Sequence, residues 1–555
     1  MKKVGAFLAA VLFCFCGVAS GKELTHDDLI ARLIHTEENS LYHEKLRSES
    51  RSWFLKRREE LVDLAMAIHN ETRANSHRHI LDILKLLMGR FPGKGIGRLI
   101  AAIEDPSSQD VFPYDNFAYQ ALILLVRSWD KKDFHCHVSP SLSVQWVVDT
   151  VGRNRGLYEE EFRKRLYDDE YADWRRENAG TVTLEAIRAF YKEKDGKEIR
   201  YIFRKYENPT DAFDIPILCY PPTYPYDNLK IFIDAVRYVV RHYFSDGVRC
   251  VQLRFNPCKK FNGHIIPIQE TLQQMYDAVV DEEYKASRKF GGKHRTEFMF
   301  CFNQSRYLDR EDQFVKAVTK AFDYGDSEPY YERICGIDFS GPESSETRRE
   351  GWKHLRNLAY KKGINLVFHG GDRWNLTDIF NEDVKQHLEY TKIAVETLGC
   401  EGRLGHGNVL IPWGYWQRAE AGCAERRFID TDNYRSDVES ILELMVEKEI
   451  TLECLPQVEF RFIENMKQHP FYYWLKKGMK LDIGIDGTCY IPGALSVWVA
   501  RLMLCSPREE TEEGGVLTVS KMKEIVMWDF CSRSPSPIRI STTPSFRTIP
   551  ESPHS

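Results

Sequence analysis

Several features that would place the chain in a common class are missing from its 555 residues. Beyond residue 21 no stretch approaches the roughly 18 consecutive apolar residues of a membrane-spanning helix, so we expect no membrane association once a leader is removed. No basic stripe follows a helix face and the formal net charge is only -5, which argues against a nucleic-acid partner. The fourteen cysteines contain no CxxC pair and no regular spacing, so no disulfide connectivity can be assigned.

The beginning of the chain has the pattern of a signal peptide over residues 1–21. A basic start, Met1-Lys2-Lys3, precedes an apolar run from Val4 to Ala19, and small residues follow at Ala19-Ser20-Gly21. This order is typical of a cleaved leader. A membrane anchor is the alternative, and it is disfavoured because the apolar run is too short to span a bilayer. The sequence therefore predicts a secreted protein, or a periplasmic one if the source is bacterial.

Residues 22–125 are predicted to form a helical N-terminal extension. Thr25 and Asp28 have the spacing of a capping box. Leucines then recur at helical intervals, at Leu29, Leu33, Leu61, Leu64, Leu81 and Leu84. No chemistry-bearing pattern occurs there, so the extension is expected to serve packing or oligomerisation.

From about residue 131 short apolar runs alternate with helical stretches. Such alternation predicts an α/β fold with a parallel sheet covered on both faces. The expected strands are residues 133–137, 250–255, 297–302, 335–339, 365–369, 403–406, 451–454 and 481–486. Eight units fit a closed (β/α)8 TIM-type barrel. We place it at 126–530, with an insertion at about 150–230 after the first barrel strand. A Ser- and Pro-rich tail, 531–555, is predicted to be disordered.

Potential metal ligands gather at the carboxyl ends of the expected strands, where active sites lie in this architecture. His135 and His137 are two apart in one strand, so their side chains point to the same side. His369, His406 and Asp486 each end another strand. Two histidines in a strand are more often structural, but the coincidence of all five at strand ends favours a site. Three imidazoles and a carboxylate suit zinc and leave room for water.

Seven segments resemble, in order over roughly residues 131–500, those of the adenosine deaminase family of metal-dependent hydrolases. They are Lys132–His137 (family HxH), Gln252–Pro257 (E-x-R-x-S-P), Gly336–Glu343 (G-I-D-L-A-G-D-E), His369–Asp372 (H-A-G-E), Arg403–Gly407 (R-x-G-H-G), Glu453–Pro456 (the segment before P-x-S-N) and Ile485–Gly487 (T-D-D). The layout is most similar to the secreted, growth-factor-related branch of that family.

The resemblance implies hydrolytic deamination of adenosine, or a related aminopurine nucleoside, to inosine and ammonia. It implies one zinc ion per chain, held by His135, His137, His369 and Asp486. His406 would orient and deprotonate the attacking water, and Asp372 would protonate the purine ring nitrogen. The backbone N–H of Gly341 would approach the purine. A homodimer through the N-terminal helices is also implied by resemblance.

The chain departs from the family pattern around the expected substrate. Asp372 replaces a Glu, Gly487 replaces the second Asp of T-D-D, Ser139-Pro140 replaces a D-G pair and Val458-Glu459 replaces S-N. Three interpretations therefore stay open. The chain is a deaminase of an aminopurine nucleoside, a hydrolase with the same metal and another substrate, or a non-catalytic relative that acts as an extracellular binding or signalling factor.

Overall fold

A computed structural model describes a little more than half of the chain. The described residues are 24–30, 33, 57–104, 116–138, 141–142, 146, 150, 228–258, 260–261, 264–303, 311–323, 328–340, 349–371, 382–399, 402–410, 431–456, 466–487, 494–511 and 514–527. The predicted signal peptide, nearly all of the predicted insertion and the predicted tail lie outside these residues. Gly341 and Asp372 lie outside them as well.

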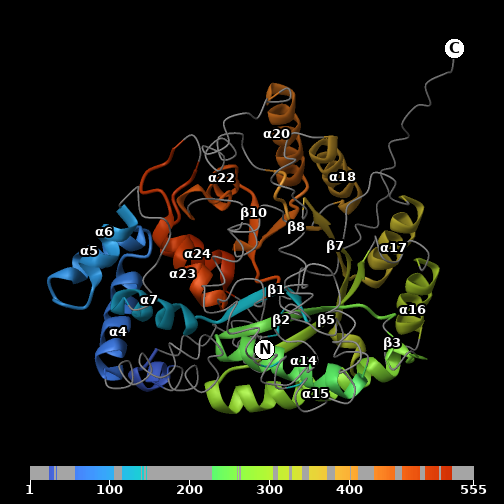
Figure 1. Cartoon of the computed structure of the whole chain (residues 1–555), viewed down its shortest axis with the longest axis horizontal. Coiled ribbons are helices and arrows are strands. Elements are labelled where there is room, and N and C mark those ends of the chain that lie inside the picture. Colours follow the sequence, from blue (N-terminus) through green and yellow to red (C-terminus); the bar gives the residue numbers. More distant parts are fainter. Residues whose placement is uncertain are drawn as a thin grey trace, which may run out of the picture.

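The N-terminal part of the described chain is helical, as predicted. It contains α4 (Arg58–Ala74), α5 (Ile80–Met88), α6 (Ile96–Glu104) and α7 (Phe117–Arg127). The capping box is confirmed, because the Asp28 N–H donates to Thr25 Oγ1 at 3.2 Å and the Thr25 N–H donates to Asp28 Oδ2 at 3.1 Å. Helix α7 packs between α4 and α23 (Leu495–Cys505), so these helices lie against one side of the barrel (Figure 1). The boundaries 22–125 and 126–530 stay predictions.

All eight predicted strands are present and form one parallel sheet in chain order. They are β1 (Lys131–His137), β2 (Val248–Phe255), β5 (Arg295–Asn303), β6 (Ile334–Ser340), β7 (Asn365–Gly370), β8 (Arg403–His406), β9 (Thr451–Cys454) and β10 (Lys480–Ile483). A short antiparallel pair, β3 (Lys260–Phe261) and β4 (His264–Ile265), follows β2. The strands form a nearly closed barrel of the (β/α)8 type, which confirms the predicted fold class.

Helices surround this barrel on the outside (Figure 1). They are α14 (Leu229–Ser245), α15 (Ile268–Phe290), α16 (Glu311–Asp323), α17 (Arg349–Lys362), α18 (Glu382–Leu398), α20 (Thr431–Glu447), α22 (Phe471–Lys476), α23 and α24 (Val519–Val526), with short 3-10 turns at Tyr331–Arg333 and Met466–Gln468. Every residue of β2 and β6 is buried, as expected for parallel strands covered on both faces. Four cysteines in the barrel strands, Cys250, Cys301, Cys335 and Cys454, are buried thiols that form no disulfide in the described part of the chain.

The last strand ends earlier than predicted, and the difference shows how the barrel closes. Strand β10 stops at Ile483 rather than Asp486. A Cβ on Gly484 would lie 2.8 Å from the Cβ of His135, so the chain passes directly against β1. The Ile485 N–H donates to Asp133 Oδ2 at 3.0 Å, and the His137 N–H donates to the Asp486 carbonyl at 3.2 Å. A buried carboxylate thus replaces part of the ladder between the first and last strands.

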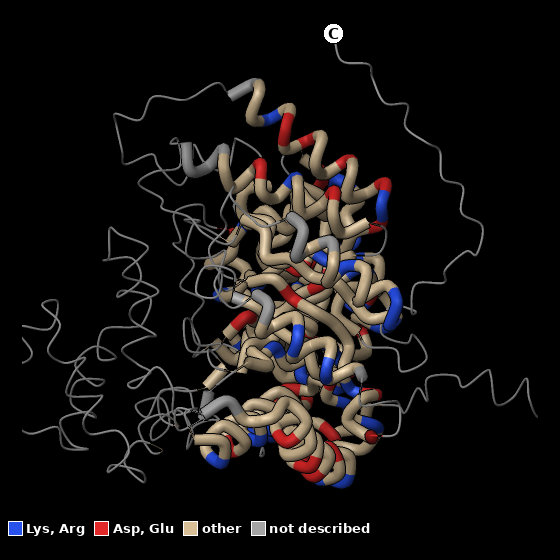
Figure 2. The backbone as a smooth tube through the Cα atoms, turned by 90° about the vertical axis from the view of Figure 1, so that its right-hand side faces the viewer, with Lys and Arg blue, Asp and Glu red and all other residues tan. Residues whose placement is uncertain are grey.

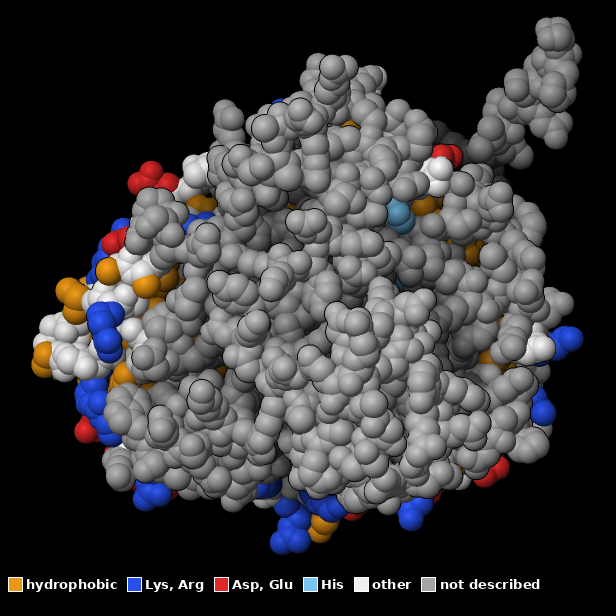
Figure 3. Space-filling model, viewed as in Figure 1, with side chains coloured by type: hydrophobic (Ala, Val, Ile, Leu, Met, Phe, Trp, Pro, Cys, Tyr) orange, Lys and Arg blue, Asp and Glu red, His pale blue; other side chains and the backbone are white. Residues whose placement is uncertain are grey.

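The described surface carries charges of both signs. Lys and Arg segments alternate with Asp and Glu segments along the helices (Figure 2), and both kinds of side chain occur along the outer edge of the face in Figure 3. Among the described residues, none of the helices combines the length and the apolar character needed to cross a bilayer.

His79 couples helix α5 to the end of α23 and makes stability depend on pH. Its Nδ1 accepts the Leu81 N–H at 3.1 Å and its Nε2 lies 3.1 Å from the Ser506 carbonyl. Burial lowers the pKa of His79, so its stabilising contribution is present above its ordinary pKa of about 6.5. That contribution is lost as pH falls through the lowered value, because the unfolded chain binds the proton more readily.

We expect His79→Ala to lower the free energy of unfolding by about 1 kcal/mol at neutral pH, as for loss of an N-cap. The difference in free energy of unfolding between the variant and the wild-type protein should be smaller at about pH 5, since the variant has no buried imidazole to protonate. Urea unfolding at the two pH values measures this, with the exposed His77→Ala as control. An equal difference in free energy of unfolding at both pH values would contradict the stabilising role of neutral His79.

Candidate metal centre

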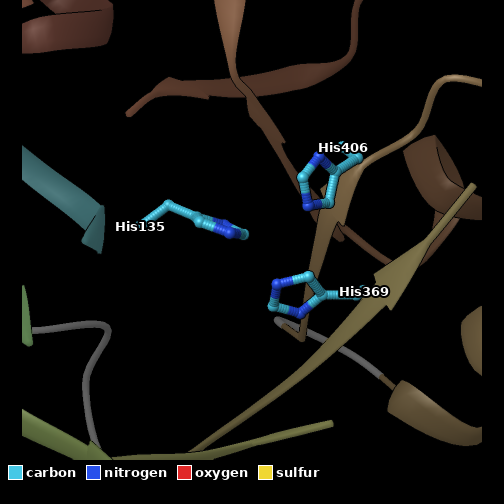
Figure 4. A group of neighbouring side chains, drawn as sticks. All are labelled: His135, His369 and His406. Atoms are coloured by element: carbon cyan, nitrogen blue, oxygen red, sulfur yellow. The ribbon is translucent and has the colours of Figure 1, made fainter. Parts of the chain in front are cut away.

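Five predicted site residues converge at the carboxyl ends of the strands. His135 and His137 come from β1, His369 from β7, His406 from β8, and Asp486 from the segment after β10. The ring centroids of His135, His369 and His406 lie 4.7 to 5.1 Å apart. Figure 4 shows these three rings pointing toward a common space, with His135 opposite the other two.

Donor atoms of these residues are spaced as ligands of one ion would be. His137 Nε2 lies 3.2 Å from His369 Nε2 and 3.6 Å from Asp486 Oδ1. His135 Nε2 lies 3.8 Å from the same carboxylate oxygen. Ligands bonded to one tetrahedral zinc ion lie about 3.4 Å apart. His406 also offers a nitrogen within 4.8 Å of those of His135 and His369, so distance alone does not separate a ligand from a catalytic base.

Carboxylates orient two of these imidazoles from behind. His135 Nδ1 lies 2.7 Å from Glu453 Oε2, and His369 Nδ1 lies 3.0 Å from Asp338 Oδ1. An Nδ1–H donated to a carboxylate leaves Nε2 with a free lone pair, which is the usual arrangement behind metal-bound histidines. The donor set and its hydrogen bonding therefore fit a divalent ion such as zinc.

Arg254 joins these two carboxylates in the barrel interior, where its side chain is fully buried. Its Nη2 donates to Glu453 Oε2 at 2.6 Å, and its Nη1 lies 3.3 Å from Asp338 Oδ2. Nη1 also lies 3.2 Å from His135 Nε2, the nitrogen that would face an ion. Ion binding therefore requires the guanidinium to release that nitrogen while keeping its two carboxylates.

The electrostatic environment favours neutral imidazoles and a charged carboxylate. Burial, then Arg254, holds the pKa of His135 well below its ordinary value, and burial, then His369, does the same for His137. Burial opposes ionisation of Asp338, but Arg254 and His369 outweigh it and lower its pKa. A neutral imidazole is the form that binds a metal ion.

Glycine allows the backbone to pass close to His135. A Cβ on Gly405 would lie 2.8 Å from His135 Cε1, inside the contact distance of real side chains. The glycine of the R-x-G-H-G pattern is thus explained by the space that the imidazole needs. His406 follows it with a φ of 67°, a left-handed conformation that is uncommon outside glycine.

The residues that hold the ligands in place were not predicted from the sequence. Arg254, Asp338, Glu453 and Asp133 lie within the motifs that resemble the family, but no role was assigned to them. Burial raises the pKa of Asp133 to about 8. The available signal was a charged residue within an otherwise apolar strand, since a buried charge needs a partner. Gly341 and Asp372, the other predicted site residues, are outside the described chain, so their roles stay predictions.

The eight-stranded barrel with histidines and a carboxylate at its carboxyl ends defines a class of barrel proteins able to bind a metal ion. No family model matches the chain. It is 22% identical over 244 residues to an adenosine deaminase of Clostridium acetobutylicum, and this match covers 44% of the chain and 57% of that relative. The chain thus spans a little over half of that protein. It is 22% identical over 375 residues to an adenine deaminase of Zymomonas mobilis, covering 67% and 84%.

A comparison with solved structures finds the N6-mAMP deaminase of Arabidopsis, at 14% identity and a TM-score of 0.41, covering 68% of this chain and 87% of that one. The adenine deaminase of Arthrobacter aurescens has 14% identity and a TM-score of 0.40, covering 66% and 85%. The curated relatives confirm the sequence similarity to the adenosine deaminase family that the motifs indicated. Similarity to its secreted branch stays a prediction.

We expect Asp338→Asn to weaken zinc binding about 10- to 100-fold, the usual effect of altering a residue that hydrogen-bonds a ligand histidine. The amide oxygen can still accept from His369 Nδ1 but carries no charge. A competition titration against a chromogenic chelator measures the affinity.

Glu297→Gln is the matched control, because this buried carboxylate contacts Gln252 and Arg295 at 2.9 Å. Equal zinc affinities for the two variants would show that Asp338 does not support the centre.

Proposed function

We propose that the chain is a zinc-dependent hydrolase of the adenosine deaminase type, which converts adenosine or a related aminopurine nucleoside to inosine and ammonia. The observation that carries the proposal is the convergence of His135, His137, His369, His406 and Asp486 at the carboxyl ends of one barrel. The similarity to proteins named adenosine and adenine deaminase supports the reaction type.

The roles of the chain's own residues follow from their chemistry. A divalent ion in this donor set supplies Lewis-acid activation of water. His406, buried beside the ligands, orients the attacking water and accepts its proton. Asp372, which follows Gly371 after β7, donates a proton to the purine ring nitrogen. Water adds to the carbon that bears the amine, the proton held by His406 passes to the amine, and ammonia leaves as the new hydroxyl group returns a proton to Asp372.

The shorter side chain of Asp372 supports a second candidate, a binding protein that keeps its ion. Asp places its carboxylate one methylene further back than the Glu of the family pattern, and a displacement of about 1 Å can cost roughly a hundredfold in rate. Gly487 in place of Asp also removes a purine contact that the resemblance implies. A hydrolase with another substrate is a further outcome of the same test.

The direct test follows ultraviolet absorbance and ammonia release when zinc-loaded protein is mixed with adenosine or adenine. We expect turnover by the native chain and a loss of about 10²- to 10⁴-fold in His406→Asn. Asn is chosen because it tolerates the left-handed backbone at this position. His354→Asn, an exposed position on α17, is the control.

Asp372→Glu distinguishes the candidates. Turnover by the Asp372→Glu variant alone would assign the native chain a binding role. Absence of turnover in both proteins would reject the proposal of a nucleoside deaminase.

Secretion and dimerisation belong to the proposal as well. Recovery from the culture medium of a chain that begins near residue 22 tests secretion. Loss of a dimer on removal of residues 22–125, measured by sedimentation, tests the homodimer; an unchanged state of association would reject it.

A further inference from the structure

A buried thiol lies beside the candidate metal centre and has no part in the proposed reaction. Cys301 is on β5, and its Cα is the direct partner of Asp338 on the neighbouring strand β6. The two side chains therefore point to the same side of the sheet. Cys301 is 8% exposed and Asp338 is fully buried, so both face the barrel interior rather than bulk water.

The thiol, the Asp338 carboxylate and His137 form a second set of potential ligands. One donor atom from each lies within 4.8 Å of the other two. Oδ2 of Asp338 accepts no hydrogen bond from the described residues, although Arg254 Nη1 lies 3.3 Å from it. One oxygen of this fully buried carboxylate therefore lies within 4.8 Å of the thiol, whose Sγ also lies 3.0 Å from Ser340 Oγ. The set combines sulfur, nitrogen and oxygen, whereas the centre formed by His135, His137, His369 and Asp486 contains no sulfur.

Ligand softness separates the two sets. Thiolates favour soft ions such as cadmium, whereas zinc is borderline and is bound by imidazole as well as by thiolate. His137 belongs to both sets, so an ion in the sulfur-containing set takes a ligand away from the other. The two positions therefore compete for an ion rather than fill independently.

We propose that Cys301, His137 and Asp338 form a second binding site for a thiophilic divalent cation, such as cadmium, that competes with the candidate catalytic centre. When the ion binds, the Cys301 S–H bond breaks, its proton passes to solvent and a metal–sulfur bond forms. Zinc at one equivalent occupies the histidine-rich set, and cadmium is drawn to the thiol. The inference rests on the proposed metal centre through the shared His137 and through Asp338, which also orients His369.

The test is a cadmium titration of the metal-free full-length protein, followed by the thiolate-to-cadmium charge-transfer absorbance in the ultraviolet. A band that saturates near one equivalent is expected in the native protein and is absent from Cys301→Ser. Cys335→Ser is the matched control, since this buried thiol on β6 donates to the Phe298 carbonyl and should leave the band unchanged. Circular dichroism shows whether each variant is folded.

A band that persists in Cys301→Ser, or no band in the native protein, overturns the proposal. His137→Ala separates the three-residue site from binding by the thiol alone. We expect this variant to need at least a tenfold higher cadmium concentration to reach half of the maximal charge-transfer absorbance. An unchanged cadmium concentration would show that His137 is not a ligand of this site. Because absorbance is read without substrate, failure here is distinguishable from failure of the deaminase assay.

Discussion

The bridge that Arg254 makes between Asp338 and Glu453 is the interaction on which the candidate centre depends. Each carboxylate holds one histidine by its Nδ1, and Arg403 Nη1 lies 3.0 Å from the other oxygen of Glu453. Two guanidinium groups thus balance two carboxylates in a space closed to water. Removing one member of such a set leaves a buried charge unpaired, at a typical cost of about 3–5 kcal/mol. The same bridge fixes the orientation of the two imidazoles. The stability of the barrel and the geometry of the metal ligands therefore depend on the same set of buried ion pairs.

Closure of the barrel places the remaining ligands. Asp133 accepts the backbone N–H of His135 at 2.9 Å and that of Ile485 at 3.0 Å, so one side chain ties β1 to the segment after β10. His137 N–H then bonds the Asp486 carbonyl. The carboxylate of Asp486 reaches the histidines of β1 because the two ends of the sheet meet there. Gly484 permits this approach by having no Cβ.

The sequence was sufficient to predict the eight strands because each is an apolar run that ends in a polar or glycine residue. It also predicted that His135, His137, His369, His406 and Asp486 would lie close together, since residues at the carboxyl ends of parallel strands meet at one end of a barrel. The supporting contacts could not be predicted. Arg254 and Glu453 are 199 residues apart, and only the stagger of the closed sheet brings them together. The end of β10 was predicted too late because the Asp133 side chain, rather than backbone hydrogen bonds to a neighbouring strand, holds the segment after Ile483.

The ligand shell of the protein loaded with one equivalent of zinc tests the central claim most directly, and X-ray absorption at the zinc edge measures it. The structure predicts imidazole nitrogens and carboxylate or water oxygens at about 2.0–2.2 Å, with no sulfur. Several imidazoles should be visible through their outer-shell scattering. A sulfur scatterer at about 2.3 Å, or a shell of oxygen without imidazole, would contradict an ion held by His135, His137, His369 and Asp486.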